Sequence, residues 1–123
     1  MYMNLTPHDI CVFREADCTY DPKTRSYYPC ANAQPRIIKP EPVPARCSQT
    51  EVVIGYKDGI PLLEVQYGEI ENLPAPKQGV IYIVSAIVAL AGRKLGRSDL
   101  AIPSRSARTV EGKIIGCCAF GLK

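Results

Sequence analysis

A serine inside the most apolar stretch of the chain is the first candidate for ligand chemistry. The stretch is GVIYIVSAIVALAG, residues 79–92, and Ser85 divides it into a β-branched half and a half rich in alanine and leucine. Because serine is a favoured N-cap, we expect a strand to end and a helix to begin at this residue. The N–H groups of Ile87 and Val88 would then lie in the first helical turn, where unpaired amides and the helix dipole attract anions. The pattern predicts a site for an anion such as phosphate.

Three arginines and a second serine follow this helix and are candidates to complete the anion site. They are Arg97, Ser104, Arg105 and Arg108. If residues 80–84 and 99–102 are parallel neighbours, the ends of both strands emerge at one edge of the sheet, where open α/β sheets bind ligands. Guanidinium groups suit phosphate because they can donate two hydrogen bonds at once. The alternative is that Ser85 only caps its helix and that the arginines are solvated surface residues.

Catalytic chemistry has weaker support in the sequence. His8 is the only histidine, so a general base near neutral pH would have to be this residue. A triad of Ser85, His8 and Asp99 can be written, but Ser85 lacks the glycines of a G-x-S-x-G nucleophile elbow. The chain also lacks the G-x-x-x-x-G-K-[ST], G-x-G-x-x-G and H-E-x-x-H motifs. We therefore expect a non-enzymatic protein, count His8 among the candidate ligand-binding residues, and keep as alternatives a structural His8 and a small hydrolase.

The six cysteines do not have the spacing of a metal site. No two of them form a C-x-x-C pair, which is how one turn presents two thiolates to zinc. We expect no metal and no cofactor. Cys117 and Cys118 are adjacent in an expected strand, so their side chains should point to opposite faces. A structural zinc, the alternative, would have to use the irregularly spaced Cys11, Cys18, Cys30 and Cys47.

The charge of the chain is unevenly distributed. The formal net charge is +3, but residues 1–47 carry +1, residues 48–92 carry −3 and residues 93–123 carry +5. The basic last quarter favours an anionic partner. Nucleic-acid binding is not expected, because the net charge is modest and no RNA-type aromatic motif is present. Residues 79–92 are shorter than the about 20 apolar residues that span a bilayer, and no secretion signal is recognisable, so we expect a cytoplasmic protein.

Turn signals and apolar patterns predict a single domain over residues 1–123. Residues 10–14 read as a first strand, and residues 16–46 hold six of the eleven prolines, which predicts a long irregular loop. Asp58-Gly59 predicts a hairpin, in whose second strand Leu63, Val65 and Tyr67 share the face that covers the core.

The C-terminal half predicts one β-α-β unit and another hairpin. A helix from Ala86 would stop at Gly92 or Gly96, and a strand over 98–104 would end at Pro103. Glu111-Gly112 predicts the turn of the second hairpin. The expected fold class is α+β: a small mixed sheet built from two β-hairpins and one β-α-β unit, with one main helix and a long Pro-rich loop. Exposed hairpin edges and the small domain favour a homodimer.

Four separated segments resemble a group of short, mostly uncharacterised proteins of phages and bacteria. They are NLTPHDI, GVIYIVSAIV, RSDLAIPS and GKIIGC, which lie in about half of the chain and leave out residues 16–46. The resemblance implies a counter-defence role in the host cytoplasm, either blocking a host immune enzyme or sequestering its nucleotide signal.

The leading hypothesis is accordingly a non-enzymatic protein that captures a phosphorylated small molecule, such as a nucleotide immune signal, beside Ser85. The first alternative is an inhibitor that contacts a host defence protein directly, through an exposed hairpin or the tyrosine-bearing loop. The second is the small hydrolase that needs His8.

Overall fold

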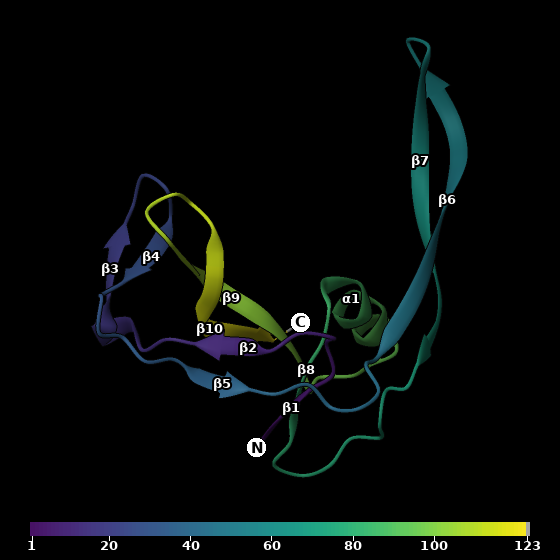
Figure 1. Ribbon diagram of the computed structural model, residues 1–123. Helices are drawn as coiled ribbons and strands as arrows, with labels where there is room; N and C mark the ends of the chain where they lie inside the picture. Colours follow the sequence, from purple (N-terminus) through teal and green to yellow (C-terminus); the bar gives the residue numbers. More distant parts are fainter. Residues whose placement is uncertain (123) are drawn as a thin grey trace.

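The computed structural model describes residues 1–122, which form a mixed eight-stranded sheet, a separate two-stranded hairpin and one α-helix (Figure 1). The main sheet has the order β1-β8-β9-β10-β2-β5, with the β3–β4 ribbon attached to β9. The expected mixed sheet with one α-helix is confirmed, in a fold richer in strands than we predicted. None of the helices among residues 1–122 is long and apolar enough to cross a lipid bilayer. The elements are β1 (Tyr2–Asn4), β2 (Ile10–Val12), η1 (Glu15–Asp17), β3 (Cys18–Asp21), β4 (Ser26–Pro29), β5 (Arg36–Ile38), β6 (Arg46–Lys57), β7 (Ile60–Glu71), β8 (Ile81–Ile83), α1 (Ala86–Lys94), β9 (Leu100–Arg108) and β10 (Ile114–Leu122).

The centre of the sheet is the parallel pair β8 and β9, with α1 between them in the chain. Tyr82 pairs with Leu100, and this part of the sheet is completely buried. The helix begins after Ser85, as the change from β-branched to alanine-rich sequence predicts. Gly96, with φ of +85°, follows the helix as its stop, whereas Gly92 lies inside it, directly against Leu100.

One side of this sheet and the inner face of α1 form the core. It closes around Tyr82, Val84, Val88 and Leu100, each no more than 1% exposed. The two strands of the β6–β7 hairpin reach this core only at their base, where Cys47 and Ile70 pack against it. The core therefore fixes α1 and the root of the hairpin, whereas the outer part of the hairpin lies beyond it.

The prediction of an irregular loop over residues 16–46 is wrong. This segment contains β3, β4 and β5, which pair with each other or with β2 and β9. Its prolines are tolerated because they lie where no ladder hydrogen bond is needed. Pro22 lies in the β3–β4 turn, Pro29 is the last residue of β4, and Pro35 precedes β5.

The strand predicted over 98–104 is longer than expected, because Pro103 does not end it. β9 runs on to Arg108 and pairs with β10, with Phe120 opposite Pro103. On its other side β9 pairs with β8 only as far as Ala101 and with β4 only at Ala107. Pro103 thus lies in a stretch of β9 with an open edge, where a missing N–H is tolerated.

The β6–β7 hairpin forms an arm that extends away from the body, as Figure 1 shows. Asp58 and Gly59 have φ of 51° and 77°, the positive values of the predicted turn. The prediction that Leu63 and Val65 face the core is wrong: both residues are exposed, as are their neighbours on the other face. Leu63 and Val65 share one face of the arm, as their alternation indicates, but the opposite face also exposes Val52 and Leu62, and most of the arm lies beyond the reach of the body.

Candidate functional site

Ser85 is the N-cap of α1 and lies at the edge of a shallow groove. Its backbone is extended, with φ of −68° and ψ of 160°, and its hydroxyl accepts a hydrogen bond from the Val88 N–H at 3.3 Å. The groove has a volume of about 360 Å³ and lies between the Pro7 loop, the start of β6 and the first turn of α1. Of the predicted ligand-binding residues, Ser85 and Ile87 line it. The Val88 N–H is already occupied by the cap.

The basic residue of this groove is Arg46, which sequence reasoning missed. Arg46 is the first residue of β6, and its side chain is exposed. Within residues 1–122 it makes no ion pair and no side-chain hydrogen bond. The sequence carried no signal for it, because Arg46 lies 39 residues before Ser85 and only the docking of the arm brings the two together.

Arg97 lies at the opposite end of the helix from Ser85. Its guanidinium donates two hydrogen bonds of 2.9 Å to the carboxylate of Asp99. This pair lowers the pKa of Asp99, chiefly through the hydrogen bond from Arg97. The guanidinium also lies 5.9 Å from the ring centre of Tyr82. Arg97 is thus held by Asp99, in the loop that leads into β9. Arg97 does not line the groove beside Ser85.

Ser104, Arg105 and Arg108 lie on β9 beyond its pairing with β8. Arg105 has a positive φ of 53° and forms an ion pair with Glu15. Arg108 donates a hydrogen bond of 2.8 Å to the carbonyl oxygen of Gly112, in the turn after β9. None of the three lines the groove that holds Ser85.

His8 is exposed and lines a different groove, together with Cys11, Pro103 and Cys117. Its ring makes no hydrogen bond within residues 1–122, and the Asp99 carboxylate is held by Arg97. The alternative catalytic triad of Ser85, His8 and Asp99 is therefore not assembled.

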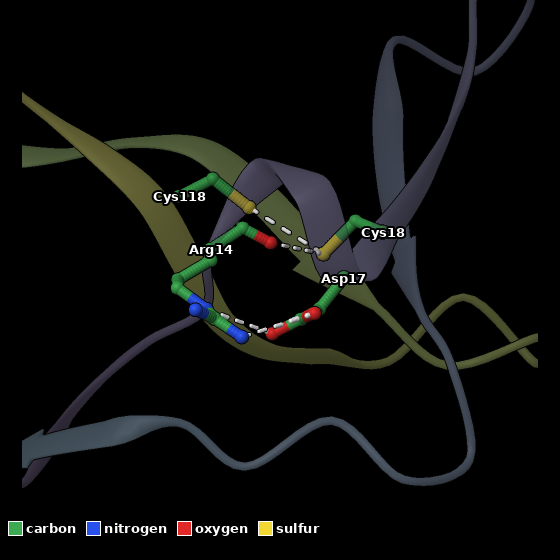
Figure 2. Close-up of polar contacts among 4 residues, drawn as sticks. All are labelled: Arg14, Asp17, Cys18 and Cys118. Carbon is green, nitrogen blue, oxygen red and sulfur yellow. Dashed lines mark hydrogen bonds and ion pairs between the residues drawn. The ribbon is translucent and has the colours of Figure 1, made fainter.

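Two thiols from distant parts of the chain meet beside η1. The Sγ atoms of Cys18 and Cys118 are 3.9 Å apart, and Cys18 also lies 3.4 Å from the carbonyl oxygen of Arg14. Figure 2 shows the thiols on one side of η1 and the Arg14–Asp17 ion pair on the other. Burial raises the pKa of Cys18, and burial together with the hydrogen bond to Cys18 raises the pKa of Cys118 to about 12. Both thiols are protonated at neutral pH, so neither is an activated nucleophile.

The cysteines of the zinc alternative are not gathered into a ligand group in the described part of the chain. No group of three or more histidine, cysteine or acidic side chains is placed to hold a metal ion there. The four cysteines that it required lie on different elements, with Cys47 at the base of the arm and Cys30 beyond β4.

The outer part of the arm is the largest concentration of exposed apolar side chains. Eight residues there are between 39% and 71% exposed: Val52, Val53, Ile54, Tyr56, Ile60, Leu62, Leu63 and Val65. Val53 lies directly opposite Leu63, and Tyr56 lies opposite Pro61. Because alternate residues of a strand share a face, one face of the arm carries Val53, Tyr56, Pro61, Leu63, Val65 and Tyr67, which we call the apolar face.

The arm presents this face without a covering layer. Only Tyr67, nearest the body, is half-buried, with the ammonium group of Lys94 4.8 Å from its ring centre. No protein-family model, curated protein or solved structure matches the chain.

Proposed function

We propose that this chain is a non-enzymatic binding protein that acts by direct protein contact through the apolar face of the β6–β7 arm. The observation that supports it is the exposure of Val53, Leu63 and Val65 on a hairpin that has no core of its own. A two-stranded hairpin is marginally stable alone in water, and it gains a lasting structure by packing against another element. The arm is therefore expected to be covered by protein when the chain is functional.

The composition of the arm fits a protein-binding surface. Large contiguous apolar patches are rare on monomeric proteins and mark interaction sites. Tyr56, near the tip, is 71% exposed, and tyrosine is enriched at interfaces because it combines a large apolar ring with a polar hydroxyl. Glu51 and Glu64 are interspersed with the apolar residues, which keeps an uncovered arm soluble.

A photo-crosslinker placed on the apolar face tests this function in cells. With Leu63 replaced by p-benzoylphenylalanine, we expect discrete protein adducts whose cross-linked peptides are identified by mass spectrometry. The matched control is the same replacement at Val110, an 88% exposed apolar residue in the other hairpin turn, which should give few or none. Equal cross-linking at both positions, or no adduct at Leu63, would contradict the proposal.

A second candidate function is capture of a phosphorylated small molecule, the leading hypothesis from the sequence. The observation that favours it is that Ser85, Ile87 and the unpaired Arg46 line one groove at the N-terminus of α1. A thermal-shift screen with inorganic phosphate, cyclic nucleotides and ADP-ribose tests it. Lys77, an exposed lysine before β8 that does not line this groove, is the matched control. A rise in Tm that Arg46→Ala removes and Lys77→Ala keeps would support this function, and no rise with any of these anions would exclude it.

A further inference from the structure

The thiols of Cys18 and Cys118, which are 100 positions apart in the chain, face each other beside η1. Their Sγ atoms are 3.9 Å apart, and Figure 2 shows the two side chains pointing toward one another. Both cysteines are free, so the contact is one between two thiols. Within residues 1–122 no other two cysteine sulfur atoms are in contact. The fold therefore selects one pair out of six cysteines.

The backbone on either side holds this pair in place. As the chain leaves β2, the Phe13 N–H donates a hydrogen bond of 2.8 Å to the carbonyl oxygen of Cys117, which precedes Cys118 on β10. The short helix η1 then turns the chain back, and Cys18 follows it directly. The Cys18 thiol donates to the Arg14 carbonyl oxygen at 3.4 Å, which also orients the side chain. The contact thus follows from the path of the chain around β10.

The two sulfur atoms lie within reach of a disulfide bond. The bond requires them to approach from 3.9 Å to about 2 Å, and rotation of the side chains about their Cα–Cβ bonds can supply a movement of this size. Cys18 and Cys118 are each partly exposed, so a small oxidant can approach them. Cys117 is buried, and its side chain points to the opposite face of β10, so it is not a competing partner for Cys18.

We propose that Cys18 and Cys118 are a site of reversible oxidation, at which a small disulfide such as glutathione disulfide converts the two thiols into an intramolecular disulfide bond. The bond fastens the β3–β4 ribbon to β10. The site is independent of the arm and of the function proposed for the arm.

The chemistry consists of two thiol–disulfide exchanges. Cys18 loses its proton to water, and its sulfur attacks one sulfur of glutathione disulfide, whose S–S bond breaks and releases one glutathione thiolate. Cys118 then loses its proton and attacks the Cys18 sulfur of this mixed disulfide, which releases the second glutathione thiolate. The two cysteines give up two electrons, and these reduce glutathione disulfide to two molecules of glutathione. An excess of reduced glutathione reverses both steps.

The hydrogen bond between the thiols sets the order of the two exchanges. Burial raises the pKa of Cys18, and the hydrogen bond from Cys118 partly offsets this effect because it stabilises the Cys18 thiolate. Burial and the same hydrogen bond both raise the pKa of Cys118. Cys18 is therefore the thiol that attacks the oxidant, and Cys118 is the one that completes the bond.

The β3–β4 ribbon is the element that the bond would restrain. Within residues 1–122 it pairs with the rest of the sheet at one position, Tyr27 opposite Ala107. Since β3 begins at Cys18, a bond to Cys118 joins the start of the ribbon covalently to β10. The β6–β7 arm lies on the other side of the body, as Figure 1 shows, and is not linked by this bond. Oxidation should thus reduce local opening of the ribbon and leave the arm unchanged.

Peptide mapping of the full chain after treatment with glutathione disulfide tests the bond. We expect a chain lighter by two hydrogen atoms and a tryptic peptide pair joined through Cys18 and Cys118, both reversed by dithiothreitol. Cys117 and Cys118 lie in one tryptic peptide, so fragmentation spectra must assign the sulfur. A bond between any other two cysteines, or glutathione adducts without an internal bond, would overturn the proposed site.

Two substitutions check that the bond depends on the contact. Cys118→Ser should abolish the joined peptides and leave a glutathione adduct at Cys18, and Cys18→Ser should abolish them as well. Cys30→Ser is the matched control, because Cys30 is exposed and follows the same ribbon but lies outside the contact, and this variant should keep the bond. Circular dichroism verifies that the variants keep their strands. Loss of the bond in Cys30→Ser would overturn the direct exchange between Cys18 and Cys118.

Hydrogen exchange measured by mass spectrometry tests the fastening of the ribbon. In the oxidised chain, amides of β3 and β4 should exchange at least about tenfold more slowly than in the reduced chain. Amides of the β6–β7 arm should exchange equally in both forms and serve as the internal control. A Cys18–Cys118 bond that leaves exchange in the ribbon unchanged would overturn the claim that oxidation fastens it. None of these outcomes bears on the cross-linking test of the arm.

Discussion

The side-chain oxygen of Asn4 accepts two hydrogen bonds from Thr6, one from its backbone N–H at 2.9 Å and one from its hydroxyl at 2.6 Å. The side-chain nitrogen of Asn4 donates to the carbonyl oxygens of His8 at 2.7 Å and Ile38 at 2.9 Å. Asn4 is completely buried, and the hydrogen-bonding capacity of its carboxamide is filled. One side chain thus folds the loop after β1 and attaches it to the end of β5.

Replacing Asn4 should destabilise the protein strongly. In Asn4→Leu the side chain keeps about the same size, but the Thr6 N–H and the carbonyl of Ile38 lose their partner in a partly buried place. We expect the free energy of unfolding, measured by urea denaturation, to fall by about 2–4 kcal/mol. His8→Ala is the control, since only the backbone of His8 takes part, and it should change stability by less than about 0.5 kcal/mol. A stable Asn4→Leu protein would show that these hydrogen bonds contribute little.

Local features of the fold could be predicted because their causes lie within a few residues. The turn at Asp58-Gly59 needs two positive φ values, and the sequence supplies the residue pair that adopts them. The start of α1 at Ser85 follows from a capping hydroxyl between a β-branched run and an alanine-rich run. Each of these predictions depends on steric and hydrogen-bonding preferences of neighbouring residues.

Relationships between distant residues could not be predicted in the same way. Leu63 alternates as a core-facing residue does, but whether an apolar face is covered depends on where the body ends. Arg97 follows the C-terminus of α1, whereas Ser85 caps its N-terminus, so the length of the helix lies between these two residues. Arg46, which is distant in sequence, lines the same groove as Ser85. Spacing along the chain indicates what a residue can do, and the tertiary fold decides which residues do it together.

Gly116, in β10, is predicted to tolerate no side chain. A Cβ atom at this position would lie 2.5 Å from the carbonyl oxygen of Cys11 and 2.8 Å from the Phe13 ring. Because the backbone of the neighbouring strand cannot shift locally, Gly116→Ala should lower the free energy of unfolding by about 2 kcal/mol or more. Gly121→Ala in the same strand is the control, because the nearest atom there is 3.9 Å away. Similar urea midpoints for the two variants would contradict the predicted clash.

The Arg97–Asp99 pair should make stability depend on acid pH. Arg97 holds the pKa of Asp99 below its usual value, so the pair stabilises the fold above the unfolded pKa of about 4, and the stabilisation is lost as pH falls through the folded pKa. Both side chains are less than one-fifth exposed. Arg97→Met should therefore lower the free energy of unfolding by about 1–3 kcal/mol at pH 7.

The same comparison at pH 3 should show a smaller difference, because pH 3 lies below the unfolded pKa of about 4 and part of the stabilisation by the pair is already lost there. Arg14→Met is the matched control, since the Arg14–Asp17 pair has an arginine that is 82% exposed and such pairs contribute about 0–1 kcal/mol. Urea denaturation at pH 7 and at pH 3 measures the free energy of unfolding of the wild type and of both variants. A difference between wild type and Arg97→Met that does not depend on pH would mean that lost packing, not the charge pair, causes it.

The contact between Cys18 and Cys118 should make both thiols slow to alkylate. With a pKa of about 12, Cys118 is ionised in only about one molecule in 10⁴ at pH 8, and the thiolate is the reactive form. Mass spectrometry after treatment with iodoacetamide should find Cys118 modified at least about 100-fold more slowly than the exposed Cys30, which serves as the internal control. Between pH 7 and 10 the rate at Cys118 should rise about tenfold per pH unit without levelling off. A plateau near pH 9 would show that Cys118 titrates as an ordinary thiol and that burial beside Cys18 does not protect it.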